Sequence, residues 1–295
     1  MPAMKWTIHT MKTKMSHACV LAAAFGCVAT ARAALTADLI GYYQFESDLA
    51  DSSGNGNDAT TTAIWNTGTN PSGPGFTGKA DFDPGDGLSD RGTLIVGKAL
   101  NLIDMKDEYI TVPFGTSELG QTFTISAWTY LSPGAGNNSS RFHAFESSNN
   151  WDVSWGNVNG NTSLMRAYVG QSALSPDSPV THEVWQHVVH VFTSDGTTTT
   201  LNVYVDGGLA STGTVATTSM NFAALHFGRA RAGTSDDRHW DGMIDEVAIW
   251  DRALDTTEIT EVYDAGVAGK PIPEPSSALL IGFGGIAVLL RRRPR

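Results

Sequence analysis

The chain has 295 residues, of which 41% are hydrophobic and only 17% are charged. Its net charge of −11 argues against nucleic acid and against an anionic membrane surface as partners, because both need a basic patch. The length allows one large domain or two small ones, and low charge with 31 glycines favours an exported all-β domain over a helical cytosolic enzyme.

The charges are distributed unevenly. Residues 1–33 and residues 276–295 each hold four basic side chains and no acidic one. Subtracting these eight from 19 leaves 11 basic against 30 acidic residues, so the middle of the chain has a formal charge of −19. Such a surplus of carboxylates either collects divalent cations in loops or serves solubility alone.

Residues 1–33 have the pattern of a secretory signal peptide. A basic segment ends near Lys14, an apolar stretch spans residues 18–28, and an Ala-Arg-Ala cleavage pattern closes the segment. We therefore expect the mature chain to begin near Ala34. Both cysteines of the chain lie inside the signal, so the mature chain is predicted to have neither a disulfide nor a cysteine nucleophile.

The middle of the chain consists of short alternating or apolar runs separated by Gly, Asn, Asp and Ser, which predicts β-strands joined by turns. Strands are expected at residues 39–45, 109–112, 123–131, 185–192, 201–205 and 243–250. In the third of these, alternation predicts that Phe123, Ile125, Ala127, Thr129 and Leu131 share one face. The pair Asp206-Gly207 is a hairpin turn signal.

Helical periodicity is confined to residues 255–265. Ile259, Val262 and Tyr263 fall on one stripe, and Asp255 or Thr256 is the predicted N-cap. Many short strands with regular turns and one short helix indicate an antiparallel two-sheet β-sandwich, with neither an internal repeat nor βαβ alternation.

The C-terminal tail, residues 269–295, has three parts. An apolar run of 13 residues spans 278–290, which is short for a permanent membrane span of about 20 residues. The flanking parts are Pro273, Glu274 and Pro275 before the run and Arg291, Arg292 and Arg293 after it. Arginines at this place would hold that end in the cytoplasm.

This tail resembles the PEP-CTERM sorting signal of Gram-negative bacteria, since all three parts are present in order. The resemblance implies a terminal hydrophobic sorting helix, transient anchoring in the inner membrane and removal of the tail by an exosortase, a membrane transpeptidase-like protease. The protein would then reach the cell surface or extracellular matrix. The alternative is an ordinary short membrane anchor.

Four blocks between residues 37 and 267 resemble the laminin G-like, concanavalin A-like lectin/glucanase jelly roll. In chain order they cover residues 43–57, 123–128, 185–207 and 227–259. The resemblance implies one laminin G-like β-sandwich over residues 34–268, between the signal peptide and the tail. This fold hosts enzymes, lectins and adhesion modules, so function has to be argued from sites.

Two enzymatic alternatives are weak. Residues 46–51 approach the Glu-x-Asp-x-x-Glu strand of the β-glucanase relatives, but the motif ends in Asp and enters a glycine-rich loop. Residues 182–187 have one residue too many for a His-Glu-x-x-His zinc motif, and His187 and His190 are three apart, on opposite faces of a strand. We therefore expect no catalytic residue and no organic cofactor, with a glycoside hydrolase as the third hypothesis.

A structural Ca²⁺ is a stronger hypothesis. The loop of residues 51–58 offers several oxygen ligands of the kind that calcium prefers. In similar jelly rolls a calcium ion often ties the opening loop to the closing strand, which implies a ligand from that strand, either Asp245 or Glu246. The candidate ligands are Asp51, Asn55, Asp58 and Asp245. The alternative is turn chemistry, in which Asp and Asn side chains bind their own backbone.

Sugar binding requires aromatic rings beside amides and carboxylates. The candidate ligand-binding residues are Asn149, Trp151, Asp152, Trp155 and Trp240. The alternative places these tryptophans in the core. The sequence thus predicts an exported, non-catalytic bacterial surface protein that binds polysaccharide, or else a structural or adhesive module that contacts another surface protein.

Overall fold

The structure is a computed structural model. It describes residues 35–46, 48–61, 75–78, 98–102, 110–113, 121–131, 140–145, 152–155, 164–169, 172–173, 178–179, 181–216, 225–228, 240 and 242–272, and at 61, 75–78, 98, 101, 140–179 and 215 the backbone alone. The predicted signal peptide lies outside the described residues, as do Pro273, Glu274, Pro275 and the arginines 291–293. Among the described residues, no helix combines the length and apolar character needed to cross a membrane.

Residues 38–272 form one compact unit built from two antiparallel sheets. The strand order in the first sheet is β14-β13-β12-β6-β16-β4-β3, with β1 also paired to β16. Its strands are β1 (Leu39–Tyr43), β3 (Gly75–Gly78), β4 (Lys98–Asn101), β6 (Phe123–Leu131), β12 (Trp185–Ser194), β13 (Thr198–Val205), β14 (Gly208–Ala216) and β16 (Gly242–Trp250).

The strand order in the second sheet is β10-β9-β8-β7-β15-β5-β2, with β11 also paired to β9. Its strands are β2 (Thr60–Thr61), β5 (Ile110–Val112), β7 (Ser140–Phe145), β8 (Asp152–Trp155), β9 (Leu164–Val169), β10 (Ser172–Ala173), β11 (Ser178–Pro179) and β15 (Leu225–Phe227). The sequence predicted this antiparallel sandwich, and the prediction is confirmed.

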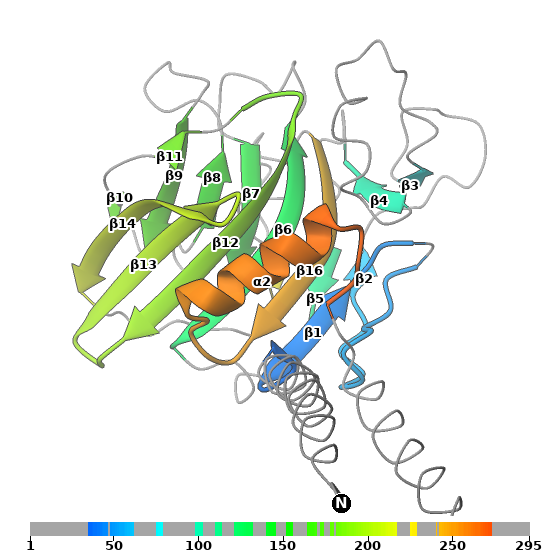
Figure 1. Cartoon of the computed structure of the whole chain (residues 1–295). Coiled ribbons are helices and arrows are strands. Elements are labelled where there is room, and N and C mark those ends of the chain that lie inside the picture. Colours follow the sequence, from blue (N-terminus) through cyan, green and yellow to red (C-terminus); the bar gives the residue numbers. More distant parts are fainter. Residues whose placement is uncertain are drawn as a thin grey trace, which may run out of the picture. The chain divides into compact units, whose positions relative to one another are not determined.

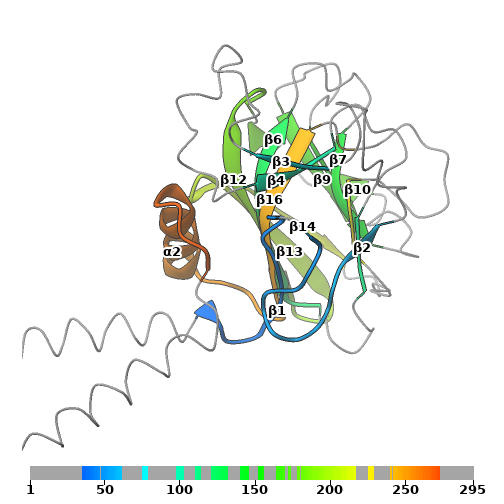
Figure 2. The ribbon, with the colours of Figure 1, turned by 90° about the vertical axis from the view of Figure 1, so that its right-hand side faces the viewer.

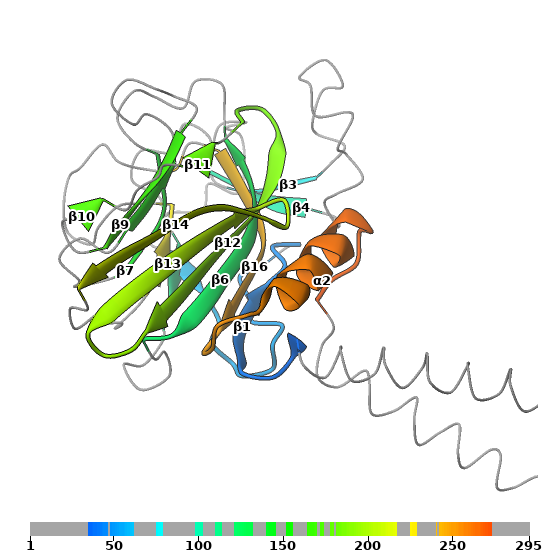
Figure 3. The ribbon, with the colours of Figure 1, turned by 60° about the vertical axis from the view of Figure 1, so that its left-hand side comes forward.

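The two sheets lie face to face, and the helix α2 (Thr256–Val267) packs outside them (Figure 1). It covers the face of the first sheet that points away from the second sheet (Figure 2). Seen from the side, α2 lies next to β1 and β16 (Figure 3). The first sheet is therefore buried on both faces, which explains why all nine residues of β6 and all nine of β16 are buried.

The two faces of β6 differ as alternation predicts. Phe123, Ile125, Ala127 and Leu131 belong to the core between the sheets, so the predicted inward face is confirmed for these four. On the opposite face Trp128 and Tyr130 form a second apolar cluster, against which Tyr263 of α2 packs.

The two histidines of β12 lie on opposite faces of the sheet. His187 pairs in register with Trp128, beneath α2, and His190 pairs with Ile125, on the core side. Burial lowers the pKa of both side chains to about 3, so both imidazoles are neutral at physiological pH. Histidines packed in this way are structural, as the sequence suggested.

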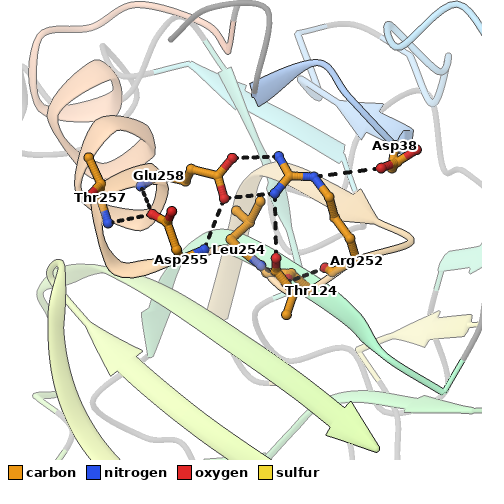
Figure 4. Close-up of polar contacts among 8 residues, drawn as sticks. Asp38, Thr124, Arg252, Leu254, Asp255, Thr257 and Glu258 are labelled. Atoms are coloured by element: carbon orange, nitrogen blue, oxygen red, sulfur yellow. Dashed lines mark hydrogen bonds and ion pairs between the residues drawn. The ribbon is translucent and has the colours of Figure 1, made fainter.

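The helix α2 begins with a capping box. Asp255 is the N-cap, and its Oδ1 accepts hydrogen bonds from the backbone N–H groups of Thr257 and Glu258. The Glu258 carboxylate accepts the N–H of Asp255 and forms a two-point ion pair with Arg252, with both N–O distances 2.7 Å (Figure 4). This network anchors the start of the helix to the end of β16.

A tight turn joins β13 and β14. Asp206 and Gly207 have φ values of +50° and +78°, and Val205 pairs with Gly208 across the turn. Positive φ at both central residues defines the type of turn that two-residue hairpins favour. The hairpin predicted from Asp206-Gly207 is therefore confirmed.

Candidate functional site

The closing strand β16 contains a bulge at two acidic residues. Its pairing with β6 joins Asp245 to Trp128 and Ala248 to Ser126, so two residues of β16 oppose one residue of β6. Glu246, inside the bulge, has a φ of +49°, a conformation that residues other than glycine adopt rarely. Backbone strain of this kind marks positions where the fold holds a side chain in an enforced orientation.

The side chain of Glu246 is bound to the first strand. The Tyr42 hydroxyl of β1 donates a hydrogen bond to Oε2 of Glu246 and accepts one from the backbone N–H of Ile272, at 3.1 Å. The other carboxylate oxygen of Glu246 has no hydrogen-bond partner among the described residues. Burial, opposed by the Tyr42 hydrogen bond and assisted by the charge of Glu46, raises the pKa of Glu246 to about 7.

Asp245 is fully buried, and neither of its carboxylate oxygens has a hydrogen-bond partner among the described residues. Burial and the neighbouring charges of Glu246 and Glu46 raise the pKa of Asp245 well above its ordinary value, and the adjacent amide of Glu246 opposes this only in part. Burial of an ionised carboxylate is costly, and among the described residues only the amide of Glu246 opposes that cost at Asp245.

A small cavity lies beneath the C-terminal half of α2, with Ser126, His187 and Glu246 on one side and Gly266 and Ile272 on the other. Its volume of ≈ 10 Å³ suits about one water molecule. Two of the lining residues each have a buried polar atom without a hydrogen-bond partner among the described residues: Nδ1 of His187 and Oε1 of Glu246.

Ser126, His187 and Glu246 together have the side-chain types of a hydrolytic triad, and Ser126 Oγ lies 2.8 Å from His187 Nε2. Ser126 and His187 are each 1% exposed and Glu246 is 7% exposed. The cavity beside them has room for about one water, so no substrate can reach the hydroxyl in this conformation. The burial and packing of this cluster fit a structural role.

The opening loop has the hydrogen bonds of an ordered turn. Asp51 Oδ1 accepts from the backbone N–H groups of Tyr42 and Ser53, and its Oδ2 accepts from that of Asn57. Asp58 accepts the N–H of Asp51 in return. These contacts are the turn chemistry that the sequence left open as the alternative to calcium.

The four predicted calcium ligands occupy different environments. The side-chain amide of Asn55 donates to the Leu39 carbonyl at 2.8 Å, and the loop carboxylates accept backbone N–H groups. Asp245 is buried and accepts no hydrogen bond from another side chain of the described residues. In the part of the chain that the structure describes, no three His, Cys, Asp or Glu side chains gather closely enough to hold a metal ion. Asp51, Asp58 and Asp245 therefore do not form such a group.

The predicted sugar-binding residues fall into three groups. Asn149 and Trp151 lie outside the described residues, and Asp152 and Trp155 are the first and last residues of β8. Trp240 is buried in the core between the sheets, where its indole N–H donates to the Met243 carbonyl at 3.3 Å. Its ring is therefore not available to stack on a sugar in this conformation.

One row of paired residues crosses the whole second sheet. In register, one residue from each of seven strands lies in the row: Thr60, Thr111, His226, Ala144, Asp152, Tyr168 and Ala173. His226 lies between Leu225 and Phe227, which both face the core, so its own position is on the outer face of the sheet. The His226 ring is only 2% exposed and forms a hydrogen bond with the Thr111 hydroxyl, at 3.0 Å.

Two residues of these sites, Tyr42 and His226, were not predicted from the sequence. Tyr42 was part of a predicted strand, but only the fold shows that its hydroxyl meets Glu246, which is 204 residues away. A usable signal did exist for the bulge, because two adjacent acids interrupt an otherwise apolar strand at Asp245 and Glu246. No comparable signal distinguished His226 from other histidines.

Comparison with known families identifies the domain. The family model described as the concanavalin A-like lectin/glucanases superfamily matches residues 104–260, more than half of the chain. The chain belongs to this family. A second model, the PEP-CTERM protein-sorting motif, matches residues 271–293, which indicates an exported protein sorted by an exosortase. The search of curated proteins found no match.

Solved structures with a similar fold include domain 4 of the extracellular arabinanase AbnA from Geobacillus stearothermophilus, solved with arabinotriose. It is 21% identical with a TM-score of 0.53, and the match covers 77% of this chain and 98% of that one. The binding domain of botulinum neurotoxin serotype D is 14% identical, with a TM-score of 0.53 and coverage of 78% and 52%. The corresponding domain of Paraclostridial Mosquitocidal Protein 1 is 16% identical, with a TM-score of 0.50 and coverage of 80% and 56%.

The chain thus spans about half of these toxin binding domains but nearly all of the arabinanase domain. At these identities the similarity shows the fold alone.

Proposed function

We propose that this protein is a non-catalytic component of the cell surface or extracellular matrix of a Gram-negative bacterium, and that it binds polysaccharide on the outer face of its second sheet. The observation that supports the proposal most is the row of paired residues through Thr111, His226 and Asp152. The similar arabinanase domain, solved with arabinotriose, supports a sugar as the ligand.

The chemistry of this face suits a sugar. The Thr111 hydroxyl and His226 imidazole are held together at 3.0 Å, and the same row passes through Asp152 and Tyr168. Hydroxyl, carboxylate and phenol groups pair with sugar hydroxyls, while aromatic rings stack on the apolar faces of a sugar. His226 is only 2% exposed, so its role in this proposal is to hold the Thr111 hydroxyl. Trp155 of β8 is three residues from Asp152 and therefore lies on the opposite face of the strand, whereas Trp151 directly precedes β8 in the sequence.

Substitution on opposite faces of the sandwich tests the site. We expect Asp152→Ala and Tyr168→Ala, two positions of the same row, to weaken retention on a bound polysaccharide about tenfold, the loss caused by removing about 1.4 kcal/mol of contacts. Asp264→Ala is the matched control, because Asp264 is exposed on α2, which covers the first sheet. Equal losses in all three variants would place the ligand elsewhere.

A structural or adhesive module that binds another protein is the second candidate. It is favoured by the similarity to toxin binding domains, although these share only the fold. Saturable capture of a cell-surface protein, with no retention on any glycan, would favour this candidate. The same result would contradict the polysaccharide proposal.

The sorting part of the proposal rests on the match to the sorting motif, residues 271–293, within the C-terminal tail. In cells that contain an exosortase, the exported chain is expected to lose its tail and reach the cell surface. In cells without the protease it should stay with the inner membrane. Fractionation with an antibody against the domain distinguishes the two outcomes, and identical distribution in both strains would contradict sorting by this route.

We also propose that a structural Ca²⁺ binds at Asp245. This residue fits a cation better than the opening loop does, because its two buried oxygens accept no hydrogen bond from another side chain of the described residues, while the loop carboxylates bind backbone amides. A bound Ca²⁺ would neutralise the buried carboxylates of β16.

Thermal unfolding tests the calcium proposal. The Tm of the unsubstituted domain is expected to be higher in calcium than in EDTA. The Tm of Asp245→Asn is expected to be the same in both, because this variant removes the charge of a calcium ligand. Asp264→Asn serves as the control with an exposed carboxylate. An equal calcium-induced rise in both variants would show that Asp245 is not the ligand.

A further inference from the structure

The chain does not leave the fold where α2 ends. Residues Ala268–Ile272, here named the strap, continue along the domain. Gly269 donates its N–H to the Gly266 carbonyl, and Lys270 donates to the Ala265 carbonyl, both at 2.9 Å. At the end of the strap, Ile272 is only 5% exposed and forms part of the cavity wall beside Glu246.

The Tyr42 hydroxyl holds the end of the strap. It accepts the backbone N–H of Ile272 and donates to Glu246, so both of its hydrogen-bonding roles are used. Tyr42 itself is 1% exposed and lies in β1, which is paired to β16. The residue that fixes the strap is therefore part of the sheet and does not move with the chain end.

The sorting motif overlaps this fixed segment. The match to the motif begins at residue 271, so its first two residues, Pro271 and Ile272, belong to the folded domain. Five residues, 273–277, separate Ile272 from the apolar run. Fully extended, five residues span at most about 18 Å, so a closed strap leaves little chain for a membrane protease to bind. Release of the strap would add five more residues.

We propose that the closed strap limits removal of the sorting tail, and we call it a latch. The hydrogen bond from the Ile272 N–H to the Tyr42 hydroxyl holds the latch closed. The partner is a membrane protease that needs the chain on both sides of Pro273 in an accessible, extended form. Only molecules with an open strap are substrates, so the rate of tail removal follows the population of the open form. This inference rests on the proposed sorting function.

The test measures the rate of tail removal by pulse–chase of the full chain in cells that contain the exosortase. Tyr42→Phe removes the acceptor of the Ile272 N–H, and we expect tail removal to be about two- to tenfold faster, the change that loss of one buried hydrogen bond produces. Tyr43→Phe is the matched control, because the neighbouring hydroxyl donates to the Asn57 carbonyl on the core side. Its rate should equal that of the unsubstituted chain.

A second variant bypasses the latch. Insertion of Gly-Ser-Gly-Ser-Pro-Ile between Ile272 and Pro273 keeps the strap in place and offers a second copy of the first two motif residues on a free linker. We expect faster tail removal from this variant and no further gain from adding Tyr42→Phe. If Tyr42→Phe alone fails to melt cooperatively, the insertion decides: a faster rate supports the latch and an unchanged rate overturns it.

The outcomes separate the latch from sorting itself. Equal rates in the unsubstituted chain, Tyr42→Phe and the insertion variant would overturn the latch while leaving the sorting function in place. A Tyr43→Phe effect as large as that of Tyr42→Phe would also overturn it, because the effect would then be general destabilisation. A tail retained in every variant would contradict the sorting function, and the latch with it.

Discussion

At the scale of single residues, the strongest feature is a pair of adjacent carboxylates inside a β-strand. Burial raises the pKa of both Asp245 and Glu246, and for Glu246 the value is about 7. Tyr42 donates the one side-chain hydrogen bond that the described residues supply to this pair. The free energy of unfolding should therefore depend on the protonation of these groups.

The direction of this pH dependence follows from the pKa of Glu246, which is 4.5 in an unperturbed side chain and about 7 in the fold. Between these values the folded chain binds more protons than the unfolded chain, so this group's contribution to stability is lost as pH rises towards 7. His187 and His190 act in the opposite direction between about pH 3 and 6.5, because burial lowers their pKa.

Glu246→Gln isolates the carboxylate from the histidines. In EDTA, we expect the free energy of unfolding of this variant, relative to the unsubstituted domain, to increase from about pH 5 to about pH 8 by at most about 1.4 kcal/mol per pH unit. Urea titrations across this range measure the difference. A difference that does not change with pH would show that Glu246 is ionised in the fold throughout.

Part of this site could be predicted at the residue scale. Resemblance to similar jelly rolls pointed to Asp245, but alternation could not show that a bulge follows it, because a bulge depends on the partner strand. The loop around Asp51 was correctly recognised as turn-rich, yet only the structure shows that backbone amides occupy both of its carboxylate oxygens. The predictions at Asn149 and Trp151 lie outside the described residues.

At the scale of elements, α2 illustrates what local sequence can predict. The helix, its Asp255 cap and its apolar stripe all come from residues within a few positions of one another, and all are confirmed. The two-residue strands β2, β10 and β11 were not predicted, since pairing with a neighbour defines them and no periodic pattern does. For the same reason the strand order of both sheets came only from the structure.

The capping box should have a measurable effect on stability. Asp255→Ala removes the acceptor for the N–H groups of Thr257 and Glu258, at 2.8 and 2.9 Å, and is expected to lower the free energy of unfolding by about 1 kcal/mol. Thr256→Ala, next to it on an exposed position, should change the value by less than about 0.5 kcal/mol. Chemical denaturation of both variants tests this, and equal effects would contradict the assigned cap.

Gly266 tests how closely α2 packs on the sheet. A methyl group at this position would lie 2.3 Å from Nε1 of Trp128, although alanine favours helices over glycine by about 1 kcal/mol. We expect the clash to dominate, so that Gly266→Ala lowers the Tm. A higher Tm would mean that intrinsic helix propensity outweighs packing here.

At the scale of the whole molecule, the chain combines an acidic β-sandwich with a C-terminal sorting signal. The fold and the family are established, and one sheet is covered by α2 while the row through His226 lies on the outer face of the other. The sequence predicted the class of fold because many short strands and turns repeat along it, but which face of which sheet α2 covers could be seen only in the structure.

The most direct test of the account is whether the domain binds a glycan. Purified residues 34–272 would be incubated with a panel of insoluble and gelled polysaccharides, first with calcium and then with EDTA, and the protein left in solution would be measured. The account predicts saturable depletion by at least one polysaccharide, weakened by Asp152→Ala and not by Asp264→Ala. No depletion by any polysaccharide, from a domain that melts cooperatively, would contradict it.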